Sequence, residues 1–104
     1  MPLFAIRATD RDDALQLRMD TREKHLQHLE RLGDRLKAAG PTLDGNGKPA
    51  GSLVIFEATD QAEARAFADA DPYAEAGLFA RVEVMPWNAL LGEWPLLGAR
   101  DEEE

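Results

Sequence analysis

Several residue types are missing or scarce in this sequence, which has no cysteine, two histidines and a single tyrosine. The absence of cysteine excludes disulfides, thiolate metal ligands and cysteine nucleophiles. No apolar run approaches the roughly 20 residues that a helix needs to cross a bilayer. The first ten residues have too short an apolar stretch for a signal peptide and lack its basic region. We therefore expect a soluble cytoplasmic protein with no membrane segment.

Basic residues are in the minority, 12 against 20 acidic residues, and the formal net charge is −8. A surface of this sign repels phosphate backbones, so we expect no nucleic-acid partner. We divide the chain into one domain, residues 1–92, and a C-terminal extension, residues 93–104. The acidic tail of the extension should be solvated and disordered. The apolar stretch Trp94–Leu97 is expected to cover an edge of the core or to reach a second subunit.

The hydrophobic pattern predicts four strands and two helices. Each helix starts with an aspartate three residues before a glutamate, the spacing of a capping box. These pairs are Asp20 with Glu23 and Asp60 with Glu63. Residues 9–19 are expected to form a loop that opens into a helical turn. The expected strands are residues 2–8, a short segment from Leu36 to Ala39 that Gly40-Pro41 bends or ends, residues 52–58 and residues 78–90; the expected helices are residues 20–33, with Gly33 just past the end, and residues 59–71.

The order of these elements is β-α-β-β-α-β, which predicts an α+β fold of the ferredoxin-like kind. Such a fold has an antiparallel four-stranded sheet with both helices on one face. The other face is left open, and an apolar open face is normally buried against a partner. We therefore expect a homodimer that forms through the open sheet face.

Asp71 stands directly before Pro72, where the second helical pattern ends. Aspartate is a favoured N-cap and proline a favoured first helical residue, so the pair could simply open a short turn, 72–76. In the predicted fold, however, the end of the second helix could approach His25 on the first helix. A carboxylate beside an imidazole fixes its tautomer and suits it to general acid/base catalysis. The alternative for His25 is a ring that only fills the core.

Two other side chains could contact a ligand. Arg22 lies one helical turn before His25, and its guanidinium could hold a carboxylate or phenolate with two hydrogen bonds. Tyr73 could donate a hydrogen bond to a bound oxyanion. The simpler alternatives are an exposed ion pair for Arg22 and a buried ring with a satisfied hydroxyl for Tyr73.

A metal or cofactor is not expected. His28 lies three residues after His25, but zinc normally takes three or four protein ligands and the chain has no other histidine. A haem site is a distant alternative, because it would require His25 or His28 to face a large apolar cavity.

Five short motifs stand out in the sequence. They are "REKHL" at 22–26, "AGP" at 39–41, "GS" at 51–52, "DADPYAEAGLF" at 69–79 and "VEVMPW" at 82–87. Together they resemble the YciI-like (YCII-related) family over residues 3–91. The resemblance implies a dimeric ferredoxin-like fold related to the dimeric α+β barrel proteins. It also implies an active-site pair, His25 and Asp71, and matches Arg22 and Ser52 to further motif positions. The implied reactions are eliminations or ring chemistry on small aromatic compounds without a cofactor.

The leading hypothesis is a small, cofactor-free enzyme, of a lyase or dehydrochlorinase-like kind, that acts on a small aromatic or anionic substrate. His25 would be the general acid/base and Asp71 would orient it. Arg22, Ser52 and Tyr73 would bind the substrate. The alternatives are a module that binds a small ligand without chemistry and a structural dimer with a vestigial site.

Overall fold

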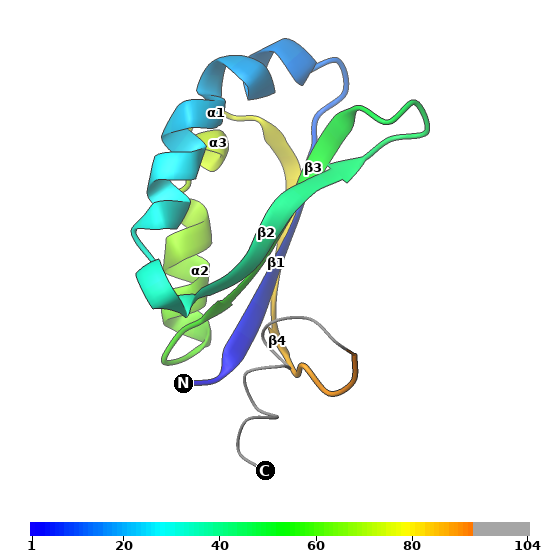
Figure 1. Ribbon diagram of the computed structural model, residues 1–104. Coiled ribbons are helices and arrows are strands. Elements are labelled where there is room, and N and C mark those ends of the chain that lie inside the picture. Colours follow the sequence, from blue (N-terminus) through cyan, green and yellow to red (C-terminus); the bar gives the residue numbers. More distant parts are fainter. Residues whose placement is uncertain (93–104) are drawn as a thin grey trace.

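The computed structural model describes residues 1–92, in which four antiparallel strands form one sheet with the order β2-β3-β1-β4. Three helices cover one face of this sheet and leave the other face bare (Figure 1). This is the ferredoxin-like α+β fold that the sequence predicts. The predicted extension, residues 93–104, lies outside the described residues. In chain order the elements are β1 (Leu3–Asp10), α1 (Leu15–Glu30), a 3-10 turn η1 (Gly33–Arg35), β2 (Leu36–Leu43), β3 (Pro49–Glu57), α2 (Gln61–Asp69), α3 (Pro72–Glu75) and β4 (Phe79–Trp87).

The core lies between the two central strands and the helices. Alternate residues of β1 point to the helices, and the antiparallel register sets Phe4 opposite Phe56 and Ile6 opposite Val54. These four side chains are between 1% and 6% exposed. The helices complete the cluster with small or aliphatic residues, namely Leu29, Leu32, Ala64 and Ala68.

The first helix begins earlier than the sequence predicts. Asp20 was expected at its N-terminus, but α1 begins at Leu15, and Asp20 lies inside it and accepts a hydrogen bond from the Gln16 amide. The true N-cap, Ala14, makes no side-chain cap, so no local signal marks the start. The predicted C-terminal end of this helix is also wrong. α1 ends at Glu30, and Gly33 belongs to the separate turn η1, where its φ is +57°.

The strand β2 continues through Gly40-Pro41, where the sequence predicts a bend or an end. Proline has no N–H to donate to a ladder, so it is tolerated only where that side of the strand has no partner. β2 is such an edge strand, because it pairs with β3 alone in the described sheet. β3 likewise begins at Pro49 rather than residue 52, and β4 ends at Trp87 rather than residue 90.

The second helix is capped as its sequence predicts. The Asp60 side chain accepts a hydrogen bond from the Glu63 N–H at 2.9 Å. The Glu63 carboxylate reaches back one residue further than in a standard capping box, to the N–H of Thr59 at 2.7 Å. Glu63 thereby ties the end of β3 to the start of α2.

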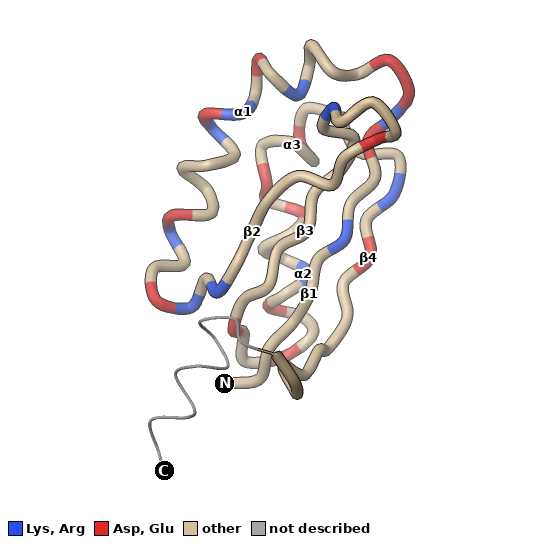
Figure 2. The backbone as a smooth tube through the Cα atoms, turned by 45° about the vertical axis from the view of Figure 1, so that its right-hand side comes forward, with Lys and Arg blue, Asp and Glu red and all other residues tan. Residues whose placement is uncertain are grey.

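Charged residues of both signs follow α1 and occur on β1 and β4, whereas β2 and β3 have few charged residues between their ends (Figure 2). On the bare face, Arg7 of β1 pairs with Glu83 of β4 at 2.7 Å. On the same face, Leu53 lies opposite Arg7 and Trp87 lies opposite Leu3, and each is 37% exposed. No helix within residues 1–92 is long and apolar enough to span a membrane.

Candidate active site

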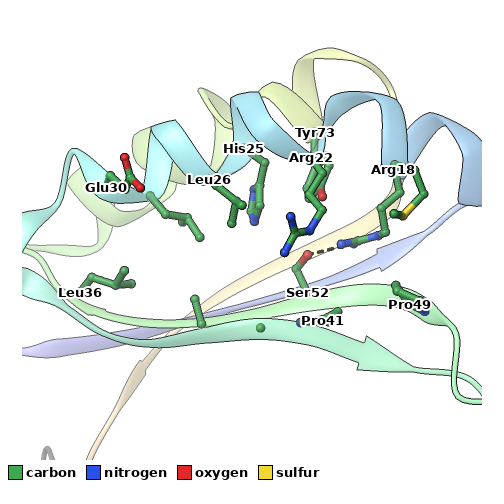
Figure 3. A pocket seen from close by; sticks show the side chains of 14 residues that line it. Arg18, Arg22, His25, Leu26, Glu30, Leu36, Pro41, Pro49, Ser52 and Tyr73 are labelled. Atoms are coloured by element: carbon green, nitrogen blue, oxygen red, sulfur yellow. Dashed lines mark hydrogen bonds between the residues drawn. The ribbon is translucent and has the colours of Figure 1, made fainter.

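A pocket of about 410 Å³ lies between α1 and the part of the sheet formed by β2 and β3. Toward one end of the pocket lie Arg18, Arg22 and Ser52. Toward the other end lie Leu26, Leu36 and the charged Glu30 (Figure 3). Such a shape suits a small molecule with one polar end and an apolar body. The lining residues are Arg18, Met19, Arg22, His25, Leu26, Leu29, Glu30, Leu36, Ala39, Gly40, Pro41, Pro49, Ser52 and Tyr73.

His25 and Asp71 are brought together by the packing of α1 against α3. The Nδ1 atom of His25 lies 3.0 and 2.9 Å from the two carboxylate oxygens of Asp71, and both side chains are buried. Asp71 is also the N-cap of α3, since its Oδ1 accepts a hydrogen bond from the Tyr73 N–H at 2.9 Å. The same carboxylate therefore caps α3 and contacts His25.

The inward face of α1 is unusually polar. Three of its four buried residues are Arg18, His25 and His28, and only Leu29 is apolar. Buried polar groups are costly unless they are hydrogen-bonded, and each of these three side chains has a partner within the protein. The spacing of Arg18, Arg22 and His25, by four and then three residues, places them on one side of the helix.

Arg18 is the site residue that the sequence analysis missed. Its guanidinium donates to both carboxylate oxygens of Asp10, at 2.7 and 2.9 Å, and to the Ser52 hydroxyl at 2.9 Å. The side chains of Arg18 and Asp10 are 5% and 6% exposed. Burial opposes the charge of Arg18, but the hydrogen bonds and charge of Asp10 outweigh it, so the pKa of Arg18 is raised above its ordinary value.

Ser52 is fixed by its backbone as well as by Arg18. The preceding residue, Gly51, leaves no room for a side chain, because a Cβ there would lie 2.4 Å from the Ala8 carbonyl oxygen and from Thr42 Oγ1. Glycine at this position lets β1, β2 and β3 approach closely. Ser52 itself is 3% exposed and lines the pocket.

Tyr73 lies between the two halves of the site. The His25 ring stacks on it with centroids 4.0 Å apart, and the Arg18 guanidinium carbon lies 4.5 Å from its centroid. A cation near the face of an aromatic ring is stabilised by the ring's quadrupole. Tyr73 therefore holds His25 and Arg18 in fixed positions, in addition to lining the pocket.

The phenol of Tyr73 should stay protonated at a pH where free tyrosine ionises. Burial raises the pKa of Tyr73, while the charges of Arg18 and Arg22 oppose that shift. The pKa of Tyr73 is higher in the folded protein than in the unfolded chain. The contribution of Tyr73 to the free energy of unfolding is therefore complete below the unfolded-state pKa, and it is lost as pH rises through the folded-state pKa. Tyr73 is the one tyrosine in the chain, so the alkaline absorbance change of tyrosinate reports it alone. Ionisation at or below the pH of free tyrosine would contradict this.

His28 has a structural role in the described residues. Its Nε2–H donates to the carbonyl oxygen of Phe67 at 2.9 Å, and its ring stacks on the Phe67 ring at 4.1 Å. Within residues 1–92, no group of three or more His, Cys, Asp or Glu side chains is placed to hold a metal ion.

The geometry lets His25 act on a ligand through one nitrogen. A carboxylate can only accept, so Nδ1 of the neutral ring carries the proton and Nε2 carries a lone pair. The ring lines the pocket while Nδ1 is used by Asp71, which leaves Nε2 to take a proton from a bound molecule.

Comparison with known proteins places the chain in a family. The model of the YCII-related domain matches residues 2–88. The chain is 42% identical over 94 residues to protein YciI of Escherichia coli O6:H1, an alignment that covers 83% of this chain and 96% of YciI. It is 38% identical over 93 residues to an uncharacterised protein of Haemophilus influenzae, with 82% and 95% of the two chains covered.

Solved structures agree in fold. The dehydrochlorinase TftG of Burkholderia phenoliruptrix AC1100, which acts on 5-chloro-2-hydroxyhydroquinone and was solved with 2,5-dihydroxybenzoquinone, matches with a TM-score of 0.78. It is 37% identical, and 83% of this chain and 93% of TftG are covered. A NIPSNAP family protein of Agrobacterium tumefaciens has a TM-score of 0.54 at 13% identity, covers 90% and 96% of the two chains, and shares the fold alone. The chain therefore belongs to the YCII-related domain family.

Proposed function

We propose that this protein is a cofactor-free enzyme that catalyses an elimination on a small hydroxylated ring compound. The observation that carries the proposal is the position of His25, which lines a pocket while its Nδ1 is held by Asp71. The similarity to TftG at 37% identity supports the same class of chemistry, loss of hydrogen halide from a hydroxylated ring.

The proposed step needs no oxidant or reductant. Nε2 of His25 removes a proton from the ring compound, and the electron pair that is released forms a new carbon–oxygen or carbon–carbon double bond. The bond to the leaving group breaks, and the leaving group departs as an anion with its electron pair. The products are the unsaturated compound, the anion and the protonated His25, which Asp71 stabilises and which later returns its proton to water.

The rest of the pocket would bind and orient the ring. Arg22 is exposed, and its guanidinium points toward Ser52 in the pocket (Figure 3). Its charge and the Ser52 hydroxyl would hold oxygen substituents of the ring. Leu26, Leu29 and Leu36 would contact the apolar body of the ring.

We further propose that the enzyme works as a homodimer that forms through the bare sheet face. Two large apolar side chains on that face, Leu53 and Trp87, are each 37% exposed. The pocket lies on the helical side of the sheet, so such a dimer would leave α1 and the pocket available to a ligand. Sedimentation equilibrium measures the oligomeric state directly.

The function is tested with 5-chloro-2-hydroxyhydroquinone and related halogenated hydroquinones. We expect the wild type to release halide and His25→Asn to lose about 10²- to 10⁴-fold in kcat, the usual contribution of a general acid/base. Halide release and the absorbance of the quinone product provide two readouts. Arg65→Lys is the matched control, because Arg65 pairs with Asp69 on the exposed surface.

Two results would count against the proposal. Turnover by His25→Asn at the wild-type rate would remove the acid/base role. Binding of these compounds by the wild type without any turnover would favour the ligand-binding module instead.

A further inference from the structure

One wall of the pocket is shaped by a β-bulge in β2. Successive residues of a regular strand point to opposite faces, so Leu36 and Ala39, three residues apart, would face opposite ways. The register of β2 with β3 shifts between Leu36 and Ala38, which makes Lys37 an extra residue on β2. Because of this bulge, Leu36 and Ala39 both line the pocket.

Together with Leu26 of α1, these two residues form what we call the leucine end of the pocket. Leu26 and Leu36 are half-buried and Ala39 is exposed, so the protein itself leaves part of this apolar surface uncovered. Apolar surface gains free energy when a ligand removes it from water. Each methylene group that a ligand buries there should tighten binding about fourfold.

The pocket is longer than a single ring. On α1 the lining residues run from Arg18 to Glu30, a rise of about 18 Å along the helix axis. On β2 they run from Leu36 to Pro41, roughly 15 Å. Two oxygens on opposite sides of a six-membered ring are only about 5.5 Å apart at ordinary bond lengths. A ring held beside His25 therefore covers only part of the two walls.

Charge at the leucine end disfavours an acidic ligand group. Arg22 lies toward the Ser52 end of the pocket, whereas Glu30 lies toward the leucine end (Figure 3). Within residues 1–92, no hydrogen bond or ion pair engages the charge of either side chain. A carboxylate on the ligand would meet Glu30 as a like charge and would lose hydration against the leucine side chains. A neutral apolar group avoids both costs.

We propose that the leucine end is a specificity subsite, and that the preferred ligands are hydroxylated ring compounds with a short, neutral apolar arm. Leu36 and Ala39, which the bulge turns to the pocket, determine this preference. The proposal deepens the proposed function and rests on it for the position of the ring beside His25.

The test compares 2,5-dihydroxybenzoquinone with derivatives that carry a propyl or a carboxyethyl group on a ring carbon. Calorimetry measures the dissociation constants for the wild type. We expect the propyl compound to bind about 30- to 100-fold more tightly than the unsubstituted quinone, because three carbons enter the subsite at about fourfold each. The carboxyethyl compound should bind no more tightly than the unsubstituted quinone.

Two variants locate the preference. Ala39→Leu fills part of the subsite and should weaken the propyl compound at least about tenfold, while binding of the unsubstituted quinone changes less than about threefold. Leu36→Ala removes contacts with the arm and should weaken the propyl compound about five- to tenfold. Leu36 packs against the core, so if Leu36→Ala does not fold, the exposed Ala39 still provides the test. Ala66→Leu makes the same change on the exposed surface of α2 and should bind as the wild type does.

Several results would overturn the inference. These are failure of the wild type to bind the propyl compound, equal affinity for the propyl and unsubstituted compounds, tighter binding of the carboxyethyl than of the propyl compound, and equal losses for both ligands in Ala39→Leu. Turnover of halogenated hydroquinones without a preference for the propyl compound would remove the subsite alone. A preference for the propyl compound without any turnover would refute the proposed function and leave the subsite standing.

Discussion

Replacement of Asp71 by asparagine should lower kcat by about 10²- to 10⁴-fold while KM changes little. Asp71 accepts from Nδ1 of His25 and so keeps Nε2 free to take a proton. An asparagine amide can donate to Nδ1 instead, which places the ring proton on Nε2, where it blocks the base. KM should be nearly constant because Asp71 is not among the residues that line the pocket. Halide release from 5-chloro-2-hydroxyhydroquinone, the compound that tests the proposed function, measures both constants.

The tautomer itself gives a second readout. Nitrogen-15 NMR of the neutral His25 ring should find the proton on Nδ1 in the wild type and on Nε2 in Asp71→Asn. Stability should hardly change, because asparagine is as good an N-cap as aspartate and can still accept from the Tyr73 N–H.

Asp69→Asn is the matched control for this prediction. It makes the same chemical change two residues earlier, at the last residue of α2, where the side chain is 61% exposed and pairs with Arg65. Its kcat should equal that of the wild type. Turnover in Asp71→Asn within about threefold of the wild type would mean that the carboxylate caps α3 and has no part in the chemistry.

The element order could be predicted because each half of the sequence carries local signals. The alternation of buried and exposed residues in β1 and the N-cap of α2 at Asp60 each depend on residues that are close in the sequence. Both features are present in the structure. The start of α1 could not be predicted in this way. Asp20 and Glu23 have the spacing of a capping box inside a helix, while the real N-cap, Ala14, has no side chain that could accept a hydrogen bond.

The error at the start of α1 also hid part of the site. With Leu15–Glu30 as the helix, Arg18 falls one turn before Arg22 and on the side of His25, which the spacing alone would have suggested. Its partners could not be found from the sequence, because Asp10 lies on a strand and Ser52 is 34 residues further along the chain. The approach of Asp71 to His25, in contrast, follows from placing both helices on one sheet face.

The path of β2 shows the same limit of local signals. Gly40-Pro41 is a strong turn signal, and it was overridden because β2 is an edge strand, whose outer N–H groups need no partner. Both residues line the pocket, so the continuation of β2 supplies one of its walls.

Replacement of Asp10 by alanine should cost about 3–5 kcal/mol of the free energy of unfolding, the usual result of removing one partner from a buried ion pair. The side chains of the pair are 5% and 6% exposed, so Arg18 would remain as a buried charge without its anion. Ser52 could not compensate, because a hydroxyl accepts a hydrogen bond but carries no charge. Urea denaturation measures the loss, and an unchanged slope would show that the folded and unfolded states keep their compactness.

Two further variants make this prediction specific to the pair. Asp10→Ala combined with Arg18→Met removes both charges and keeps a long side chain, so it should be clearly more stable than Asp10→Ala alone. Asp69→Ala breaks the exposed pair with Arg65 and should change stability little. If Asp10→Ala costs less than about 1 kcal/mol, water in the pocket must solvate Arg18 well enough to replace the carboxylate.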